Sequence, residues 1–450
     1  MFGWKLSLRY FLGRRISILA VASVALCVFI VVVVMSVMNG LVAEFKEKNH
    51  RFVGDCVIRA QSLTGFPYAD EFVKQLDSQA FVAAVSETVS GAGLMTTPGD
   101  AYNTGIEYMG LDPENHCRVT NFAQTLRYHR DNPSKAFEPS YAPHLEGCVL
   151  GVDLIVARRP DTGEYDEPDS AWMQRRIISS FPLTPKGGLA RAGVDMVSAK
   201  TFYYSDRSHS GLVIPDGRMV YLPLPQARIL SGMDSPILRS SAIHIRFRED
   251  VSTESGTEKV RTLWREFVKS YQDKPYSEML ASVRVMSWKQ DRREYIAPME
   301  KEQILLMFLF LMLGVVTVFI IFVVFYMIIG HKTKDLGVLK SVGMPGASVA
   351  AVFLWFAAIV GVIGSFIGTT AGCLFLWKIN DFENWLYNHY GWRVWDRQIY
   401  AIDRIPNEIG IWFLIVVASC AVAACLLGAI VPSVQAARKD AVRVLQVSQV

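Results

Sequence analysis

The sequence predicts a membrane protein with four transmembrane α-helices and a large α+β extracytoplasmic domain between the first and second helices. Only 20% of the 450 residues are charged and 51% are hydrophobic, whereas a typical soluble domain has about 25% charged residues. Residues 41–303 nevertheless have an ordinary soluble composition. Four other stretches lack Asp, Glu, Lys and Arg for more than the roughly 20 residues that a helix needs to cross a bilayer; they are 16–40, 304–330, 348–377 and 409–434.

The first apolar stretch follows a basic segment, as a signal peptide would. It is longer than the apolar core of a signal peptide, which has about 7–15 residues, and no small-x-small cleavage site ends it. We therefore expect residues 16–40 to be an uncleaved helix. Within residues 1–15, Trp4, Leu8 and Phe11 recur at helical spacing beside a basic face. This pattern predicts a cytoplasmic interfacial helix, with an ordinary basic flank as the alternative.

The distribution of Lys and Arg predicts the orientation of the chain in the membrane. Residues 1–15, the loop 331–347 and the tail 435–450 together hold ten basic and two acidic residues. The segment 378–408 holds four basic and five acidic residues. Because basic residues accumulate on the cytoplasmic side, we expect both termini to be cytoplasmic and residues 41–303 to be exported. The aromatic residues of the 378–408 loop indicate contact with the outer membrane surface or a cap on the exported domain.

The exported domain is predicted to contain two β-α-β units that bracket an insertion. The insertion, at about 95–235, is richer in Gly, Pro and short apolar runs, which indicates strands and turns. Apolar periodicity assigns the remaining elements: strand 53–60, helix 68–77 and strand 81–89 before the insertion, then strand 242–247, helix 258–271 and strand 283–288 after it.

Several function classes are excluded by what the sequence lacks. The net charge of +4 comes from 46 basic and 42 acidic residues, and no basic stripe suggests nucleic-acid binding. The sequence has no G-x-x-x-x-G-K-[ST], H-E-x-x-H, C-x-x-C or G-x-S-x-G motif. We therefore expect no catalytic residues, no metal site and no cofactor in this chain.

The histidines and cysteines of the exported domain also form no recognisable site. The four insertion histidines lack metal-ligand spacing and are interpreted as isolated surface residues; they are His116, His129, His144 and His209. Seven cysteines cannot all pair internally. Among the exported cysteines Cys56, Cys117 and Cys148, a bridge between the last two is conceivable.

A short segment between the second and third apolar stretches combines basic and apolar residues. Leu336 and Leu339 recur at helical spacing among lysines, and Gly343 with Pro345 ends the pattern. A helix this short is not stable alone. Its apolar face must therefore be buried against the membrane or in the groove of a partner.

Three glycines recur at four-residue spacing in the third stretch. Gly364, Gly368 and Gly372 form G-x-x-x-G twice over, a spacing that lets two helix backbones approach closely. The alternative is that Gly is simply common in membrane helices. None of the four stretches contains Asp, Glu, Lys or Arg, which weakens channel and proton-relay functions and favours a membrane part that transmits motion.

Four segments give the chain a resemblance to permeases of the MacB–FtsX superfamily of ABC transporters, closest to the lipoprotein-releasing LolC/LolE permeases. Residues 36–40, S-V-M-N-G, match the Lol pattern as they stand, and 399–406 resemble the extended loop before the last helix. Residues 332–343 resemble the family's K-x-(K/R)-(D/E) coupling segment. Pro432 to Leu445 fit the family's tail, although Ala441 replaces its usual proline.

The resemblance implies a permease subunit of the bacterial inner membrane that moves its periplasmic domain to release lipoproteins. It implies as partners a cytoplasmic ABC ATPase dimer, which would bind ATP and Mg, and a second permease subunit, identical or not. Leu336 and Leu339 would fill a groove of the ATPase, and Lys334 and Lys340 would pair with its acidic rim. The complete set of residues implied for this coupling helix is Lys332, Lys334, Asp335, Leu336, Leu339, Lys340 and Gly343.

Other functions remain open at this stage. Within the same fold, the alternatives are MacB-like efflux and FtsX-like control of cell-wall hydrolases by mechanotransmission. A membrane receptor or scaffold without energy input is an alternative from a different class. It leaves the basic and apolar segment between the second and third stretches without a role.

Overall fold

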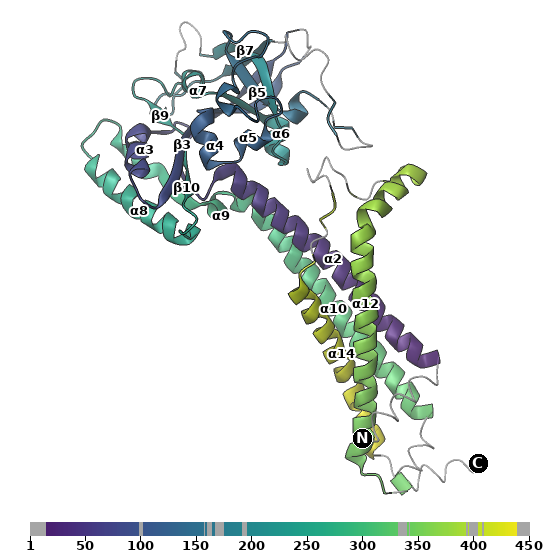
Figure 1. The fold of residues 1–450 in the computed structure, drawn as a ribbon. Helices are drawn as coiled ribbons and strands as arrows, with labels where there is room; N and C mark the ends of the chain where they lie inside the picture. Colours follow the sequence, from purple (N-terminus) through teal and green to yellow (C-terminus); the bar gives the residue numbers. More distant parts are fainter. Residues whose placement is uncertain are drawn as a thin grey trace. The chain divides into compact units, whose positions relative to one another are not determined.

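The computed structural model describes residues 15–98, 102–156, 158–159, 164–166, 175–190, 196–331, 340–341, 343–392, 395, 404–406 and 409–438 (Figure 1). The predicted interfacial helix at residues 1–15 lies almost wholly outside this range. The chain separates into two compact units. The helical unit comprises 1–44, 298–394 and 404–450, and the domain unit comprises 45–297 and 395–403.

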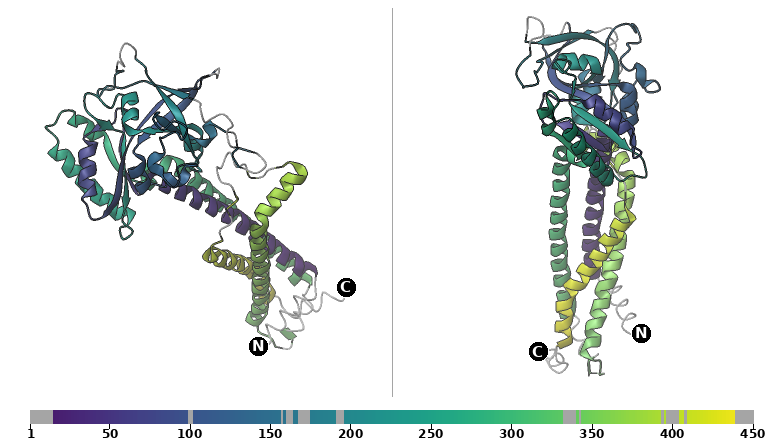
Figure 2. Two further views of the ribbon diagram at one scale, coloured as in Figure 1. Left: turned by 45° about the horizontal axis from the view of Figure 1, so that its top comes forward. Right: turned by 90° about the vertical axis from the view of Figure 1, so that its left-hand side faces the viewer.

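Four long helices in the described part of the chain are long and apolar enough to cross a membrane. They are α2 (Arg15–Val53), α10 (Arg293–His331), α12 (Gly346–Tyr390) and α14 (Ile411–Arg438). Within the helical unit they run alongside one another (Figures 1 and 2). Each contains one of the four predicted apolar stretches, and a sheet-rich domain follows the first. The predicted fold class is therefore confirmed.

Three of these helices extend well beyond the predicted apolar stretches. Helix α2 continues to Val53 and is followed by Gly54, whose φ of +83° ends the helix. Helix α12 continues to Tyr390 and is followed by Gly391, with a φ of +68°. Hydropathy marks only the part of a helix that lies in lipid, whereas the helix continues until a backbone signal stops it. The predicted strand 53–60 consequently begins only at Cys56.

The predicted β-α-β units are both present, and their strands interleave in one sheet. The first unit is β1 (Cys56–Ala60), α3 (Ala69–Asp77) and β3 (Val82–Thr96); the second is β10 (Ala242–Phe247), α8 (Thr253–Ser270) and β11 (Val283–Ser287). The strand order is β11-β1-β10-β3, and each neighbouring pair is antiparallel. Each unit thus encloses a strand of the other, as in a split β-α-β arrangement.

One face of this sheet buries an aromatic core beneath α3 and α8. Phe72 of α3 packs edge-on against Trp264 of α8 with ring centroids 4.8 Å apart, and the Phe267 ring centroid lies 4.9 Å from that of Phe72. Apolar residues of β1, β3 and β10 on the sheet face that packs against these helices complete the cluster. Each buried large apolar side chain contributes about 1.5–3 kcal/mol. This core holds β3 in place, and β3 also belongs to the insertion.

The insertion forms a closed ring of six strands that shares β3 with the sheet. The ring runs β3-β4-β8-β5-β7-β6 and returns to β3, because the far end of β3 (Gly93–Thr96) pairs with β6. The further strands are β4 (Thr104–Leu111), β5 (Gly147–Gly151), β6 (Arg175–Ser180), β7 (Ser198–Ser208) and β8 (Met219–Pro223). A separate pair joins β2 (Phe66–Pro67) to β9 (Arg239–Ser240).

The insertion also contains short helices that the sequence analysis did not predict. They are α4 (Pro113–Val119), α5 (Phe122–Thr125), α6 (Val213–Arg218) and α7 (Leu224–Ser231), and α9 (Trp288–Asp291) follows the sheet. Most span only one or two turns, too few to display apolar periodicity. Their residues are positioned by packing on the strands rather than by helix propensity.

His116 is not an isolated surface histidine, contrary to the sequence interpretation. Its side chain is buried, its Nδ1 lies 3.1 Å from the Ser86 hydroxyl, and its ring centroid is 5.6 Å from that of His244. His244 is also buried, with its Nδ1 2.9 Å from the Val53 carbonyl oxygen. Burial, followed by the positive charge of Arg59, lowers the pKa of His244 to about 4. Burial likewise lowers the pKa of His116.

The buried histidines predict that acid loosens the domain unit. Because the pKa of His244 falls from about 6.5 unfolded to about 4 folded, the unfolded chain takes up this proton first as the pH falls. The stability contributed by neutral His244 is complete above pH 6.5 and is lost between pH 6.5 and 4. Arg59, Arg292 and Asp291 also act on this ring. We expect protection of β10 amides against hydrogen exchange to fall between pH 7 and 5.

The comparison of two histidine variants isolates this effect. His244→Gln should flatten the pH dependence of β10 protection, since glutamine does not titrate. His144→Gln, at an exposed position, should leave the dependence as in the parent. An unchanged pH dependence in His244→Gln would contradict the assignment.

Candidate functional site: the helical unit

The glycines of α12 lie directly against α2. A Cβ atom added to Gly364 would lie 2.8 Å from Val24 Cβ, and one added to Gly372 would lie 2.9 Å from Val32 Cγ1. At Gly368 the added atom would lie 2.5 Å from the carbonyl oxygen of Ala25. Real Cβ contacts are essentially never this short. The two helices therefore approach to a distance that only glycine permits.

Two further glycines bring α14 into the same bundle. A Cβ on Gly361 of α12 would lie 3.0 Å from Val422 Cα of α14. A Cβ on Gly428 of α14 would lie 2.7 Å from the Val318 carbonyl oxygen of α10. Close contacts at glycine thus connect α2 to α12, α12 to α14 and α14 to α10. A close-packed interface contains no voids into which a helix could move. When one helix is displaced, the neighbouring helices must therefore move as well.

The S-V-M-N-G segment of α2 makes specific contacts within the helical unit. Asn39 Oδ1 accepts a 2.6 Å hydrogen bond from Gln303 Nε2 of α10. A Cβ on Gly40 would lie 2.6 Å from Pro406 Cβ, in the segment before α14. Ser36 is buried, and the structure describes no partner for its hydroxyl group among the residues it covers. The motif therefore marks a packing and hydrogen-bonding position.

The last residues of the expected coupling helix contact the end of α14. Lys340 Nζ donates a 2.6 Å hydrogen bond to the carbonyl oxygen of Ala437. A Cβ on Gly346, at the start of α12, would lie 2.9 Å from the same oxygen. The carbonyl groups at a helix C-terminus carry partial negative charge and attract a cation. Lys340 therefore connects the segment between α10 and α12 to α14.

Gly343 and the other expected coupling residues can be placed only in part. Gly343 has a φ of +96°, which favours glycine, and its backbone N–H donates to the Lys340 carbonyl oxygen over 3.0 Å. This geometry fits the expected stop signal. The remaining expected residues lie outside the described range; they are Lys332, Lys334, Asp335, Leu336 and Leu339.

The described residues contain no cluster of three or more His, Cys, Asp or Glu side chains that could hold a metal ion. All seven cysteines are free thiols, so the conceivable bridge between Cys117 and Cys148 is not formed. Burial raises the pKa of Cys148 and of Cys56 to about 12, which keeps both thiols protonated and unreactive. These cysteines pack as small apolar residues.

Residues 307–441 match the family described as FtsX-like permease C-terminal. This part of the chain is similar to FtsX-like permease domains. It takes in most of α10 and all of α12 and α14, together with Lys340, Gly343 and the α12 glycines. The resemblance inferred from the sequence motifs is thereby confirmed.

Two of the relatives that we describe match this chain over nearly its whole length. The chain is 21% identical over 460 residues to the lipoprotein-releasing system transmembrane protein LolC of Neisseria meningitidis serogroup B, covering 98% of both chains. It is 20% identical to the LolC protein of Xylella fastidiosa, covering 96% of both. The LolE protein of Haemophilus influenzae is 23% identical over 119 residues, which cover 26% of this chain and 29% of LolE.

Solved structures also match the chain. One of them is the periplasmic region of MacB from Actinobacillus actinomycetemcomitans, at 12% identity and a TM-score of 0.30. The match covers 55% of this chain and 95% of that structure.

Proposed function

We propose that this chain is a permease subunit of an ABC transporter that releases lipoproteins from the bacterial inner membrane. The observation that carries the proposal is its similarity to LolC proteins over 98% of both chains, together with the FtsX-like domain at 307–441. A local match would support only a shared domain. A full-length match supports the same role, namely that of a permease subunit whose partner hydrolyses ATP. ATP and Mg bind the partner ATPase in this proposal, and this chain catalyses no reaction.

The proposed orientation follows from the distribution of basic residues. Both termini and the loop 331–347 lie in the cytoplasm, and residues 41–303 and 378–408 lie in the periplasm. The cytoplasmic partner is an ABC ATPase dimer, and a second permease subunit completes the membrane part. The lipoprotein is the cargo, held by the membrane and domain parts of the two permeases.

The proposed transmission begins at the segment 332–343. ATP-driven closure of the ATPase dimer displaces this segment, and Lys340 passes the displacement to the C-terminal end of α14 through Ala437. The glycine contacts pass it to α12, α10 and α2. Since α2 continues without interruption to Val53 and α10 begins at Arg293, both helices reach into the domain unit and can move it.

Co-purification and ATPase measurements test the proposal. The tagged full chain should co-elute in mild detergent with an ATPase that contains a P-loop, and with a second permease unless it forms a homodimer. Adding purified lipoprotein to the complex in proteoliposomes should stimulate ATP hydrolysis and release the lipoprotein. A complex that hydrolyses ATP but responds only to small amphiphiles would indicate efflux instead. Absence of any ATPase would reject the transporter and favour a receptor or scaffold.

The Lys340 contact predicts a variant that uncouples hydrolysis from release. Lys340→Met removes the donor to Ala437 but leaves Leu336 and Leu339 for the ATPase. We expect the complex to assemble and hydrolyse ATP, with lipoprotein release reduced about threefold to tenfold, the loss that one hydrogen bond supports. Release and hydrolysis would be measured together in proteoliposomes.

Two further lysine variants serve as controls for Lys340→Met. Lys340→Arg keeps a cationic donor and should retain more release than Lys340→Met. Lys378→Met removes an exposed lysine paired with Asp381 and should behave as the parent. Loss of ATPase binding in Lys340→Met would instead assign Lys340 to the rim of the ATPase.

A further inference from the structure

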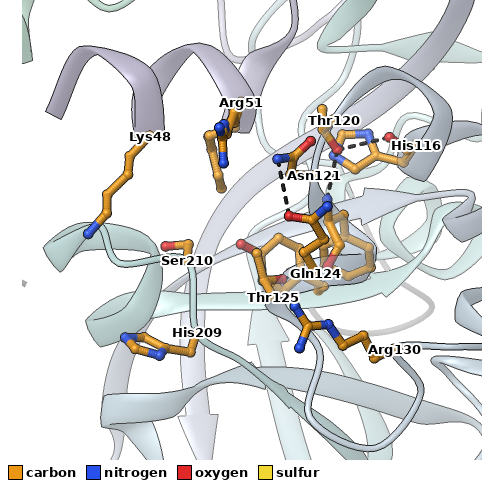
Figure 3. A pocket seen from close by; sticks show the side chains of 13 residues that line it. Lys48, Arg51, His116, Thr120, Asn121, Gln124, Thr125, Arg130, His209 and Ser210 are labelled. Atoms are coloured by element: carbon orange, nitrogen blue, oxygen red, sulfur yellow. Dashed lines mark hydrogen bonds between the residues drawn. The ribbon is translucent and has the colours of Figure 1, made fainter. Parts of the chain in front are cut away.

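A cavity lies in the domain unit where the last turns of α2 meet the segment after α4 and the end of β7 (Figure 3). Its volume is about 220 Å³, far above the roughly 10–15 Å³ that one water requires. The side chains around it come from three separate parts of the sequence, namely 48–52, 116–130 and 209–221. None of the roles considered above uses this cavity.

Backbone hydrogen bonds hold the walls of the cavity in place. The Asn121 N–H donates to the Arg51 carbonyl oxygen over 3.0 Å, which ties the end of α2 to the segment after α4. The His209 N–H donates to the Thr125 carbonyl oxygen over 2.8 Å, which ties the end of β7 to α5. The side chains that face the cavity are therefore positioned before any ligand arrives.

The lining is cationic. Lys48, Arg51 and Arg130 contribute positive charge, and none of the thirteen lining residues that the structure describes is Asp or Glu. Lys48 Nζ lies over Gly211, where an added Cβ would be only 2.7 Å from it. Arg51 uses Nε for a 2.6 Å pair with Glu47, and its planar guanidinium group has further donors. Figure 3 shows Arg51 beside Asn121 and Gln124, Arg130 below them, and Lys48 to the left.

The charge of Lys48 also acts on His209, which lines the same cavity. Burial, followed by the charges of Arg158, Lys48 and Arg207, lowers the pKa of His209 to about 4. Asp216 Oδ2 lies 3.8 Å from His209 Nε2. Asp216 is occupied by hydrogen bonds from the Ser210 N–H, the Ser210 hydroxyl and the Gly211 N–H. His209 is therefore a neutral ring beside the cationic side chains of this lining.

We propose that this cavity binds a phosphate group. Guanidinium and ammonium groups provide the charge-assisted hydrogen bonds that phosphate oxygens accept. The Gln124 side-chain oxygen lies 3.4 Å from Asn121 Nδ2, so the Gln124 amide nitrogen is the end that can donate to a ligand. Phe52, Phe122 and Tyr221 close the lining and reduce the local dielectric, which strengthens such bonds. The phosphate can belong to a phospholipid headgroup or to a soluble phosphate. The proposal does not depend on the transport function.

Calorimetric titration of the purified full chain in an uncharged maltoside detergent tests the site. One arm uses inorganic phosphate, with chloride at equal ionic strength as the blank. The other uses dihexanoyl phosphatidylglycerol, with dihexanoylglycerol as the phosphate-free blank. We expect one saturable site for at least one phosphate probe. Binding of the lipid alone identifies a headgroup as the source, and binding of inorganic phosphate alone identifies a soluble source.

Charge-removing variants locate the binding. Arg130→Gln and Lys48→Gln should each weaken phosphate binding about tenfold or more, because each loses a charge-assisted bond. Arg118→Gln makes the same change at an exposed position of α4 outside the lining and should bind as the parent. Arg130 is itself exposed, so its variant should fold even if Lys48→Gln does not. Absence of saturable binding, parental binding by Arg130→Gln, or equal weakening by Arg118→Gln would overturn the proposal.

Discussion

Gly368→Val is expected to prevent the helical unit from assembling, so that little folded protein is recovered from the membrane. The added Cβ would meet the Ala25 carbonyl oxygen at 2.5 Å and Val28 Cβ at 2.8 Å. Backbone atoms of α2 cannot move aside without displacing the whole helix. Overpacking typically costs about 1–3 kcal/mol, and we expect at least the upper end here. The measurement is the yield of monodisperse protein in detergent and its apparent Tm.

The same substitution on another transmembrane helix provides the control. Gly314 of α10 has open space around its Cα, with no atom within 4 Å of an added Cβ. Gly314→Val should therefore leave the yield and Tm of the isolated chain close to those of the parent. Equal losses in both variants would show that valine is generally harmful in these helices. Parental behaviour of Gly368→Val would contradict the close packing of α12 on α2.

The double substitution Leu336→Asp and Leu339→Asp is expected to abolish co-purification of the ATPase. In the proposed function these leucines fill an apolar groove, and a carboxylate placed there would lose its hydration without gaining a partner. Burial of an unpaired charge costs several kcal/mol, so two such changes should reduce ATPase binding more than a hundredfold. The ratio of ATPase to permease in pull-downs from membranes measures this loss.

The conservative pair Leu336→Met and Leu339→Met serves as the control, because it keeps apolar volume and should retain ATPase. Both double variants should reach the membrane in parental amounts, since the segment lies in the cytoplasmic loop of the proposed orientation. Undiminished ATPase in the aspartate variant would remove these leucines from the coupling site while leaving the remaining permease assignment open to test.

The glycine pattern of α12 shows how far a sequence can predict a contact. The spacing of Gly364, Gly368 and Gly372 identifies the face of the helix that can be approached closely, because helical periodicity places the three in line. It does not identify the helix that packs there. That α2 is this helix, and that Gly361 instead faces α14, depends on how four helices share a limited space.

Lys340 illustrates the same limit for charge. The sequence places this lysine on the basic side of a short segment. From the sequence, we expect it to pair with acidic residues of a partner protein. The tertiary structure adds the Ala437 carbonyl oxygen, an acceptor nearly one hundred residues away. Backbone acceptors carry no signature in the sequence, because every residue has one.

The sequence by itself determined the four apolar helices, their likeness to FtsX-like permeases and the two β-α-β units, because hydropathy, periodicity and motifs are local properties. Only the tertiary structure decided that the units interleave, that β3 is shared with a closed ring of strands, and that His116 is buried beside His244. It also decided that Lys48, Asn121, Arg130 and His209 enclose one cavity. These outcomes depend on contacts between residues far apart in the chain, which form only when the whole core is packed.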